Sequence, residues 1–283
     1  MNKTVFKFFS IFVLLLGTPA RAGSAGAAEP WQLGLQEAAS PVKEHVHDFH
    51  MLLMVILTGI VLLVTGLLLY VMLRYNEKAN PEPAKFTHNV TLEMIWTGIP
   101  VLILFVIAVP SFRVMYYMDR AIEPEMTLKV TGYQWYWGYE YPDLEGVNFM
   151  SYMVPEDETD TAKGEKRLLE TDTKVVLPVN TNIQILVTSA DVLHSWAMPS
   201  FGIKTDAVPG QLNETWVRID KPGTYYGQCS EICGAGHAYM PIQIRAVSKE
   251  DFEKWSDKAR EQYAETGTVP EIELAQMTGG SER

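Results

Sequence analysis

Two long apolar runs constrain this 283-residue chain more than any other feature. The first covers residues 49–73 and has no charged residue between Asp48 and Arg74, and the second covers residues 94–117. A helix of about 20 apolar residues is long enough to cross a bilayer. We therefore predict two membrane spans joined as a hairpin by the polar segment between them.

The N-terminus has the pattern of a secretory signal peptide. A positively charged start precedes an apolar core over residues 8–16 and a small-residue cleavage site that ends at Ala22. A genuine first membrane helix is the alternative, but the apolar core is short for a span. We expect residues 1–22 to be removed, with cleavage as late as residue 28.

Export of the N-terminus sets the expected topology. Residues 23–120 would form a periplasmic N-terminal segment followed by the hairpin. Lys78 and Lys85 lie in the segment between the spans, and basic residues in such loops favour the cytoplasmic side. The chain is thus expected to be integral to the bacterial cytoplasmic (inner) membrane, with everything after about residue 120 in the periplasm.

The sequence pattern changes in residues 121–247. Short runs rich in β-branched and aromatic residues alternate with turn residues, which predicts an antiparallel sandwich or barrel. Helical periodicity returns only at Lys249–Tyr263, so residues 248–283 are expected to form a helix and a loose tail. Residues 121–247 carry 17 Asp and Glu against 9 Lys and Arg. This acidic balance argues against a nucleic-acid partner and suits docking of a basic protein.

The segment Cys229–Met240, CSEICGAGHAYM, holds the chain's two cysteines. Two cysteines in an exported protein first suggest a disulfide. Blue-copper sites instead combine a Cys thiolate, two histidines and an axial Met, and Cys233, His237 and Met240 with the upstream His194 would supply that set. A single copper leaves Cys229 unexplained, whereas two coppers sharing both thiolates use it. Such a centre has no open position for substrate and favours electron transfer.

The segments CSEICGAGHAYM, VLHSWAMPSFGIKTDAVPG and GYQWYWGYEYPD together resemble subunit II of haem–copper cytochrome c oxidases of the bacterial and mitochondrial type. The resemblance covers nearly the whole mature chain. It implies an N-terminal two-helix transmembrane hairpin and an all-β cupredoxin-like Greek-key barrel over residues 121–247, holding the binuclear copper centre CuA.

The same resemblance implies an electron-accepting subunit of an oxidoreductase and translocase. Electrons from cytochrome c would pass through CuA to haem in subunit I, where oxygen reduction is coupled to proton translocation. The implied partners are subunit I and other oxidase subunits, cytochrome c and the lipid bilayer. No catalytic residue is expected in this chain.

Individual roles are implied by position. The implied copper ligands are His194, Cys229, Cys233, His237, Met240 and the backbone carbonyl of Glu231. The Glu231 side chain is implied to bind a magnesium ion shared with subunit I, although a plain surface carboxylate is the alternative. Trp135 is implied to receive the electron from cytochrome c, and Asp191 and Glu140 are expected to contribute docking charge. Glu93 suits a helix N-terminus, and the resemblance places it at the cytoplasmic mouth of a proton pathway.

Some positions depart from the family pattern or invite another interpretation. Gln211 stands where arginine is usual, and Ala190 where an acidic residue is frequent, so contacts with subunit I and docking charge are in doubt there. The histidines of HVHDFH, residues 45–50, are interpreted as an interfacial polar cap instead of a second metal site.

Three other classes of protein compete with this interpretation. A membrane-anchored copper chaperone or thiol-redox protein can carry two cysteines four residues apart, but usually has one anchor and an α/β pattern. A quinol oxidase subunit II shares the hairpin and barrel but lacks the thiol and imidazole set. A nitrous oxide reductase carries a similar loop but is larger and soluble.

Overall fold

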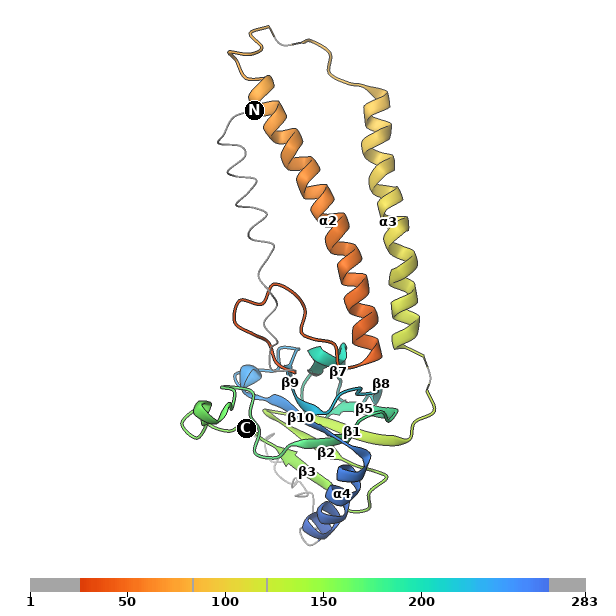
Figure 1. The fold of residues 1–283 in the computed structure, drawn as a ribbon, viewed down its shortest axis with the longest axis vertical. Coiled ribbons are helices and arrows are strands. Elements are labelled where there is room, and N and C mark those ends of the chain that lie inside the picture. Colours follow the sequence, from red (N-terminus) through yellow and green to blue (C-terminus); the bar gives the residue numbers. More distant parts are fainter. Residues whose placement is uncertain (1–25, 83, 121, 265–283) are drawn as a thin grey trace, which may run out of the picture.

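The computed structural model of the chain describes residues 26–82, 84–120 and 122–264. The expected signal peptide over residues 1–22 and the expected loose tail beyond residue 264 lie outside the described residues. The described part consists of a long helical hairpin that stands on a β domain (Figure 1).

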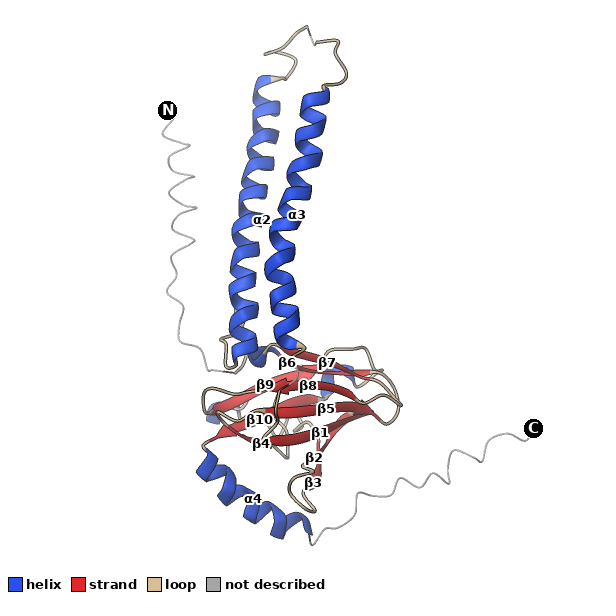
Figure 2. Cartoon of the chain, turned by 90° about the vertical axis from the view of Figure 1, so that its right-hand side faces the viewer, coloured by secondary structure: helices blue, strands red, loops and turns tan. Residues whose placement is uncertain are grey.

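The helices α2 (Pro41–Arg74) and α3 (Val90–Met118) run side by side and project away from the β domain (Figures 1 and 2). Both are long and apolar enough to cross a membrane, and their apolar segments are not buried in the protein. The spans predicted at residues 49–73 and 94–117 are therefore confirmed as helices. Each helix extends beyond its predicted span at both ends.

The start of α2 is attached directly to the β domain. The Ser40 hydroxyl caps the helix by accepting a hydrogen bond from the Lys43 amide at 3.1 Å, and it donates to the Phe201 carbonyl at 2.7 Å. The Ala39 amide donates to the Ser200 carbonyl at 3.0 Å. A serine cap satisfies an otherwise unpaired amide of the first turn, and here the same residue joins the helix to the domain.

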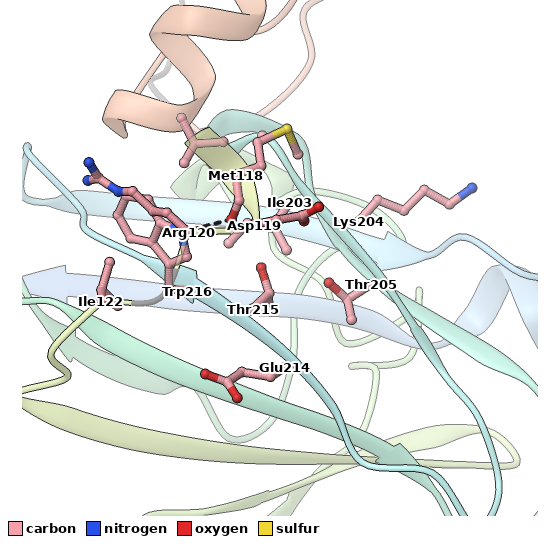
Figure 3. A pocket seen from close by; sticks show the side chains of 12 residues that line it. Met118, Asp119, Arg120, Ile122, Ile203, Lys204, Thr205, Glu214, Thr215 and Trp216 are labelled. Carbon is pink, nitrogen blue, oxygen red and sulfur yellow. Dashed lines mark hydrogen bonds between the residues drawn. The ribbon is translucent and has the colours of Figure 1, made fainter. Parts of the chain in front are cut away.

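The end of α3 is held by β8 of the same domain. The Trp216 indole donates to the Met118 carbonyl at 2.9 Å, as Figure 3 shows. Met118 is the last residue of α3, so this bond satisfies a carbonyl that the helix leaves unpaired. Both helices of the hairpin are thus tied to the β domain at the end of the hairpin that meets it.

In the described residues of the β domain there are ten strands in two five-stranded sheets. The first sheet has the order β3-β2-β1-β5-β8, and the second has the order β4-β10-β9-β6-β7. The strands are β1 (Met126–Tyr133), β2 (Tyr136–Glu140), β3 (Asn148–Ser151), β4 (Val175–Pro178), β5 (Ile183–Ser189), β6 (His194–Met198), β7 (Ile203–Ala207), β8 (Asn213–Val217), β9 (Gly223–Cys229) and β10 (Pro241–Val247).

The expectation of a wholly antiparallel domain is wrong in two places. β1 pairs with β5, and β10 pairs with β4, in parallel. Parallel neighbours need a long connection, and both pairs are separated in sequence by several other elements. The remaining strand pairs are antiparallel.

Alternating burial fixes the register of the central strands. Along β1 the side chains alternate between buried and half-buried, and Leu128 and Val130 have no exposed surface. Its parallel neighbour β5 has the same alternation, with Ile185 and Val187 fully buried. A shift by one residue would turn these side chains out of the core. The strand ends that carry the polar residues described below are therefore fixed as well.

The helix predicted at Lys249–Tyr263 is confirmed as α4 (Lys249–Ala264). It lies at the end of the β domain opposite the hairpin (Figure 2). Trp255 packs on Tyr141 with ring centroids 5.3 Å apart. The helix covers the core there and takes no part in the site described next.

The aromatic run GYQWYW is a hairpin instead of one strand. β1 ends at Tyr133 and β2 begins at Tyr136, and these two residues face each other across the antiparallel ladder. Gln134 and Trp135 form the turn between them. This turn presents Trp135 at the tip of the sheet, beside the loop that follows β9.

Candidate metal centre

Two strands of the second sheet bring the segments of the site together. β9 ends at Cys229, and its loop continues through a short 3-10 turn, η3 (His237–Tyr239), to Met240 just before β10. β6 begins at His194 and pairs with β9, so that Trp196 lies opposite Cys229. Because β6 and β9 are antiparallel, the start of β6 and the end of β9 lie at the same end of the sheet. The loop and the upstream histidine therefore meet there.

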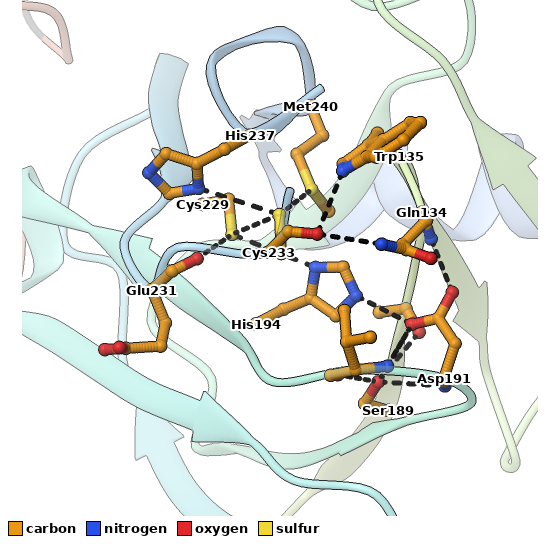
Figure 4. Close-up of polar contacts among 12 residues, drawn as sticks. Gln134, Trp135, Ser189, Asp191, His194, Cys229, Glu231, Cys233, His237 and Met240 are labelled. Atoms are coloured by element: carbon orange, nitrogen blue, oxygen red, sulfur yellow. Dashed lines mark hydrogen bonds and ion pairs between the residues drawn. The ribbon is translucent and has the colours of Figure 1, made fainter. Parts of the chain in front are cut away.

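Five side chains converge there, as Figure 4 shows. The sulfurs of Cys229 and Cys233 are 3.8 Å apart, so no disulfide joins them. Nδ1 of His194 lies 3.9 Å from Cys229 Sγ, and Nδ1 of His237 lies 3.6 Å from Cys233 Sγ. The Met240 thioether is 3.5 Å from Cys233 Sγ. The structure thus gathers two thiols, two imidazoles and a thioether around one small volume.

The backbone carbonyl and the side chain of Glu231 point in different directions. Its backbone oxygen lies 3.3 Å from Cys229 Sγ, which brings the carbonyl to the group of ligand-type atoms. Its side chain is exposed and points away from the sulfurs (Figure 4). The carbonyl and the carboxylate of one residue therefore face different surroundings.

Electrostatics make the two thiols unequal. Burial opposes ionisation of Cys229, but hydrogen-bonding contacts led by His194 outweigh it and lower the pKa of Cys229 to about 6. Burial, together with the negative charge on Cys229, raises the pKa of Cys233 to about 12. Without a metal, the pair therefore carries one negative charge near neutral pH. A bound metal cation would permit the second thiol to ionise as well.

His194 is held in one tautomer by Asp191. The histidine is fully buried, and its Nε2–H donates to a carboxylate oxygen of Asp191 at 2.9 Å. In the neutral ring this leaves the Nδ1 lone pair for a metal ion, and in the protonated ring Nδ1–H donates to the Cys229 thiolate. Burial lowers the pKa of His194, but its contacts with Cys229 and Asp191 more than compensate, and the net shift is upward. Burial likewise raises the pKa of Asp191, but the bond from His194 together with those from the backbone amides of Val192 and Gln134 outweighs it, so that the net shift is downward.

Trp135 lies between the protein surface and the loop Cys229–Met240. Its half-buried indole donates to the Cys233 carbonyl at 3.2 Å, and the Gln134 amide donates to the same oxygen at 2.9 Å. The indole lies on the loop's glycines, since a Cβ at Gly236 would be 2.3 Å from its ring. Gly234 has φ +119°, a conformation that favours glycine.

The other residues singled out in the sequence lie apart from this group. Glu140 is exposed at the end of β2 and forms an ion pair with Lys129 at 2.8 Å. Glu93 lies in the first turn of α3, after the Asn89 cap, at the end of the hairpin far from the β domain (Figure 1). Among the described residues, His194, Cys229 and Cys233 form the one buried group of this kind that could hold a metal ion.

Several residues that shape the site were missed by sequence reasoning. Gly132 lies against the His194 ring, where a Cβ would be 2.8 Å from Cδ2. Gln134 links the hairpin turn to Cys233, and Trp137 donates to the Met240 carbonyl at 3.2 Å. A glycine inside a strand signals close approach of another group, so Gly132 could have been identified. The hydrogen bonds from Gln134 and Trp137 leave no comparable mark in the sequence.

Known proteins share both parts of this architecture. A family model described as the periplasmic domain of cytochrome c oxidase subunit II matches residues 126–247, and one described as its transmembrane domain matches residues 28–114. A probable cytochrome c oxidase subunit 2 of Rickettsia bellii is 48% identical over 250 residues, which cover 88% of this chain and 92% of that protein.

Two further relatives extend the comparison. The cytochrome c oxidase subunit 2 of Phytophthora megasperma is 52% identical over 233 residues, covering 81% of this chain and 87% of that protein. The crystal structure of the periplasmic domain of subunit II of the Bradyrhizobium japonicum oxidase is 46% identical, with a TM-score of 0.47, and covers 51% of this chain and 99% of that one.

The predicted fold class is confirmed. A hairpin of two helices long enough to span a membrane precedes a β domain of two sheets, and the His and Cys side chains converge on the late loop of that domain. Both segments match the same family, and the match to whole relatives runs through hairpin and β domain alike. On these grounds, the chain belongs to the cytochrome c oxidase subunit II family.

Proposed function

We propose that this chain holds the binuclear copper centre CuA and is the subunit through which cytochrome c delivers electrons to the oxidase. One observation carries the proposal. Two free thiols lie 3.8 Å apart in a largely buried group that also contains two imidazoles and a thioether. Bound copper would supply one-electron redox chemistry at this position.

The residues fit two copper ions. Thiolate and thioether sulfurs are soft ligands that suit copper, and imidazole binds it as well. Each sulfur has its own histidine nearby, His194 for Cys229 and His237 for Cys233. Met240 and the carbonyl of Glu231 complete the set. Because the side chains are largely buried, the site excludes substrate and suits electron transfer.

Trp135 is our proposed point of electron arrival. It is the half-buried aromatic residue whose indole bonds to the backbone of Cys233 at 3.2 Å. An electron arriving at this ring would need only that hydrogen bond to reach a residue of the copper loop. The glycines beneath the ring allow this short separation.

Docking charge and partner contacts complete the proposal. Cytochrome c docks on the acidic β domain, where Glu140 and the half-exposed Asp191 contribute negative charge. Electrons continue to haem in subunit I, where oxygen is reduced and protons are translocated. The Glu231 carboxylate, exposed beside the copper loop, binds a magnesium ion shared with subunit I. We assign Glu93 to the cytoplasmic mouth of a proton pathway in subunit I, and its place in the first turn of α3, far from the β domain, supports the cytoplasmic side.

The membrane arrangement follows the family and the fold. The chain is a membrane protein with two spans and a periplasmic domain. We place it in the bacterial cytoplasmic membrane, with the segment between α2 and α3 on the cytoplasmic side. This orientation puts the copper loop where a periplasmic cytochrome c reaches it.

The test is the copper content and the electron paramagnetic resonance spectrum of the full chain purified in detergent. We expect two coppers per chain and one unpaired electron whose signal is split by both copper nuclei. The Cys229→Ser variant should lose the shared signal, and the neighbouring Ser230→Ala variant should keep it. One copper per chain, or a Cys229–Cys233 disulfide that excludes copper, would overturn the proposal in favour of a chaperone or thiol-redox protein.

A further inference from the structure

We infer that the cavity between the hairpin and the β domain binds the phosphodiester headgroup of an anionic phospholipid through Arg120. The cavity has a volume of about 430 Å³, within the ~300–1,000 Å³ typical of small-molecule sites. Its lining combines the end of α3 with β7 and β8 (Figure 3).

The cavity lies where the spans leave the bilayer. Met118, the last residue of α3, and Val42, in the first turn of α2, both contribute to its lining. The polar headgroups of a bilayer occupy the layer just outside the hydrocarbon core. The rings of Tyr117 and Trp216 lie beside each other at the cavity, with centroids 5.9 Å apart, and such aromatic residues are enriched at the membrane interface.

Arg120 is oriented by aromatic rings and not by a carboxylate. Its guanidinium carbon lies 4.1 Å from the Tyr117 ring centroid and 4.7 Å from that of Trp216. One nitrogen donates to the Tyr117 hydroxyl at 3.3 Å. Among the residues that the structure describes, Arg120 forms no ion pair. Its remaining N–H groups are therefore available to bind phosphate oxygens, to which the planar guanidinium fork is well matched.

The rings of Tyr117 and Trp216, which form a platform beneath Arg120, are themselves held in place. Trp216 is held by its bond to the Met118 carbonyl at 2.9 Å. The ring of His45 packs edge-on against Tyr117 at 4.3 Å, so α2 supports the platform from the other side. A pre-positioned arginine loses less side-chain freedom when it binds an anion.

The charges around the cavity favour a lipid over a free anion. Arg120 and Lys204 are balanced by Asp119 and Glu214 in the same lining, so the cavity does not attract a multiply charged phosphate by net charge. A phospholipid brings one negative phosphodiester together with acyl chains. Exposed apolar residues on the last turns of α3, such as Phe112 and Met115, provide the surface for those chains.

The experiment measures lipid binding to the full chain in detergent by native mass spectrometry. Phosphatidylglycerol, phosphatidylcholine with the same acyl chains, and inorganic phosphate are titrated separately. We expect retention of phosphatidylglycerol, and Arg120→Gln should weaken it about tenfold, because a charge-assisted hydrogen bond is lost. Arg218→Gln is the matched control, since Arg218 lies outside the cavity lining and pairs with Asp220 at 3.6 Å.

Each alternative outcome is distinct. Equal phosphatidylglycerol binding by Arg120→Gln and the unchanged chain would overturn the inference, provided that both unfold at the same temperature. Phosphatidylcholine bound as tightly as phosphatidylglycerol would overturn the requirement for an anionic lipid. Inorganic phosphate that displaces the lipid in equimolar amounts would show a simple anion site. In the assembled oxidase, a photo-crosslinker at position 120 that labels only another subunit would show that protein fills the cavity.

Discussion

The two histidines of the metal group lie in contrasting parts of the molecule. His194 opens strand β6, is fully buried, and has its outer nitrogen bound to Asp191. His237 opens the short turn η3 and is half-buried. Its Nδ1 contact within the described residues is to Cys233. One histidine belongs to the strand framework, and the other belongs to the loop.

This contrast indicates how the centre is assembled. The strand side is pre-organised, because the sheet, Asp191 and Gly132 fix the His194 ring before any metal arrives. On the loop side the backbone is held by hydrogen bonds from Gln134, Trp135 and Trp137, whereas the half-buried His237 ring is expected to gain its final orientation from metal binding. Substitutions on the strand side should therefore cost more copper affinity than equivalent substitutions on the loop side.

Substitution of His194 or His237 by alanine should produce the largest change in copper affinity. His194→Ala removes a buried ligand that no water can replace, and we expect the copper affinity to fall by more than about 100-fold. His237→Ala should cost less, because solvent reaches that position. Competition with a copper chelator measures both affinities. Equal losses in the two variants would remove the distinction between strand side and loop side.

Gly132→Ala tests how closely the strand framework fits the ring. The new Cβ would be 2.8 Å from His194 Cδ2, and overpacking of this kind costs about 1–3 kcal/mol. Denaturant unfolding of the copper-free chain measures the loss of stability. Gly34→Ala is the control, because no atom lies within 4 Å of its Cβ position. A Gly132→Ala variant as stable as the control would mean that the ring shifts freely.

Asp191→Asn tests the hydrogen bond that orients His194. Loss of such an outer partner typically weakens metal binding by about 10–100-fold, and we expect a value in this range from chelator competition. Glu140→Gln should leave copper affinity unchanged, since Glu140 pairs with Lys129 away from the site. The Glu140→Gln variant is instead expected to associate more slowly with cytochrome c. A copper affinity that is unaffected in Asp191→Asn would restrict Asp191 to docking.

The thiol pair offers the finest test of the same contrast. Because the pKa of Cys229 is lowered to about 6 and that of Cys233 is raised to about 12, the copper-free chain should hold one thiolate between these pH values. The thiolate is present above the lower pKa and is lost as the pH falls through it. Ultraviolet absorbance of the thiolate measures this transition. Cys229→Ser should abolish it, and a transition retained in that variant would assign the thiolate to Cys233.

Features with a local signature were predictable from the sequence. The two spans follow from their apolar length, and the helix at Lys249–Tyr263 follows from its periodicity. The spacing within CSEICGAGHAYM brought Cys229, Cys233, His237 and Met240 into one loop. His194 could be proposed as the upstream partner because it follows a run of strand residues.

Features that depend on distant partners were not predictable. The parallel pairing of β1 with β5 joins segments about 57 positions apart, as the register Met126–Ile183 shows, and no local pattern encodes it. The turn at Gln134 and Trp135 lacks the usual glycine or asparagine, so the aromatic run reads as continuous. The sequence led us to interpret Asp191 as docking charge. Its hydrogen bond to His194 depends on the folded positions of both side chains and leaves no mark in the sequence.

The cap at Ser40 has a geometric consequence for the whole molecule. Because Ala39 and Ser40 are hydrogen-bonded to Ser200 and Phe201, α2 starts directly at the β domain. The rotation of the β domain about the bilayer normal, relative to the membrane anchor, is then set by the helical phase of α2. One residue inserted after the cap would rotate the anchor by about 100° and displace it by about 1.5 Å. The helical phase of α2 therefore determines the direction in which the loop that carries Cys229 and Cys233 faces.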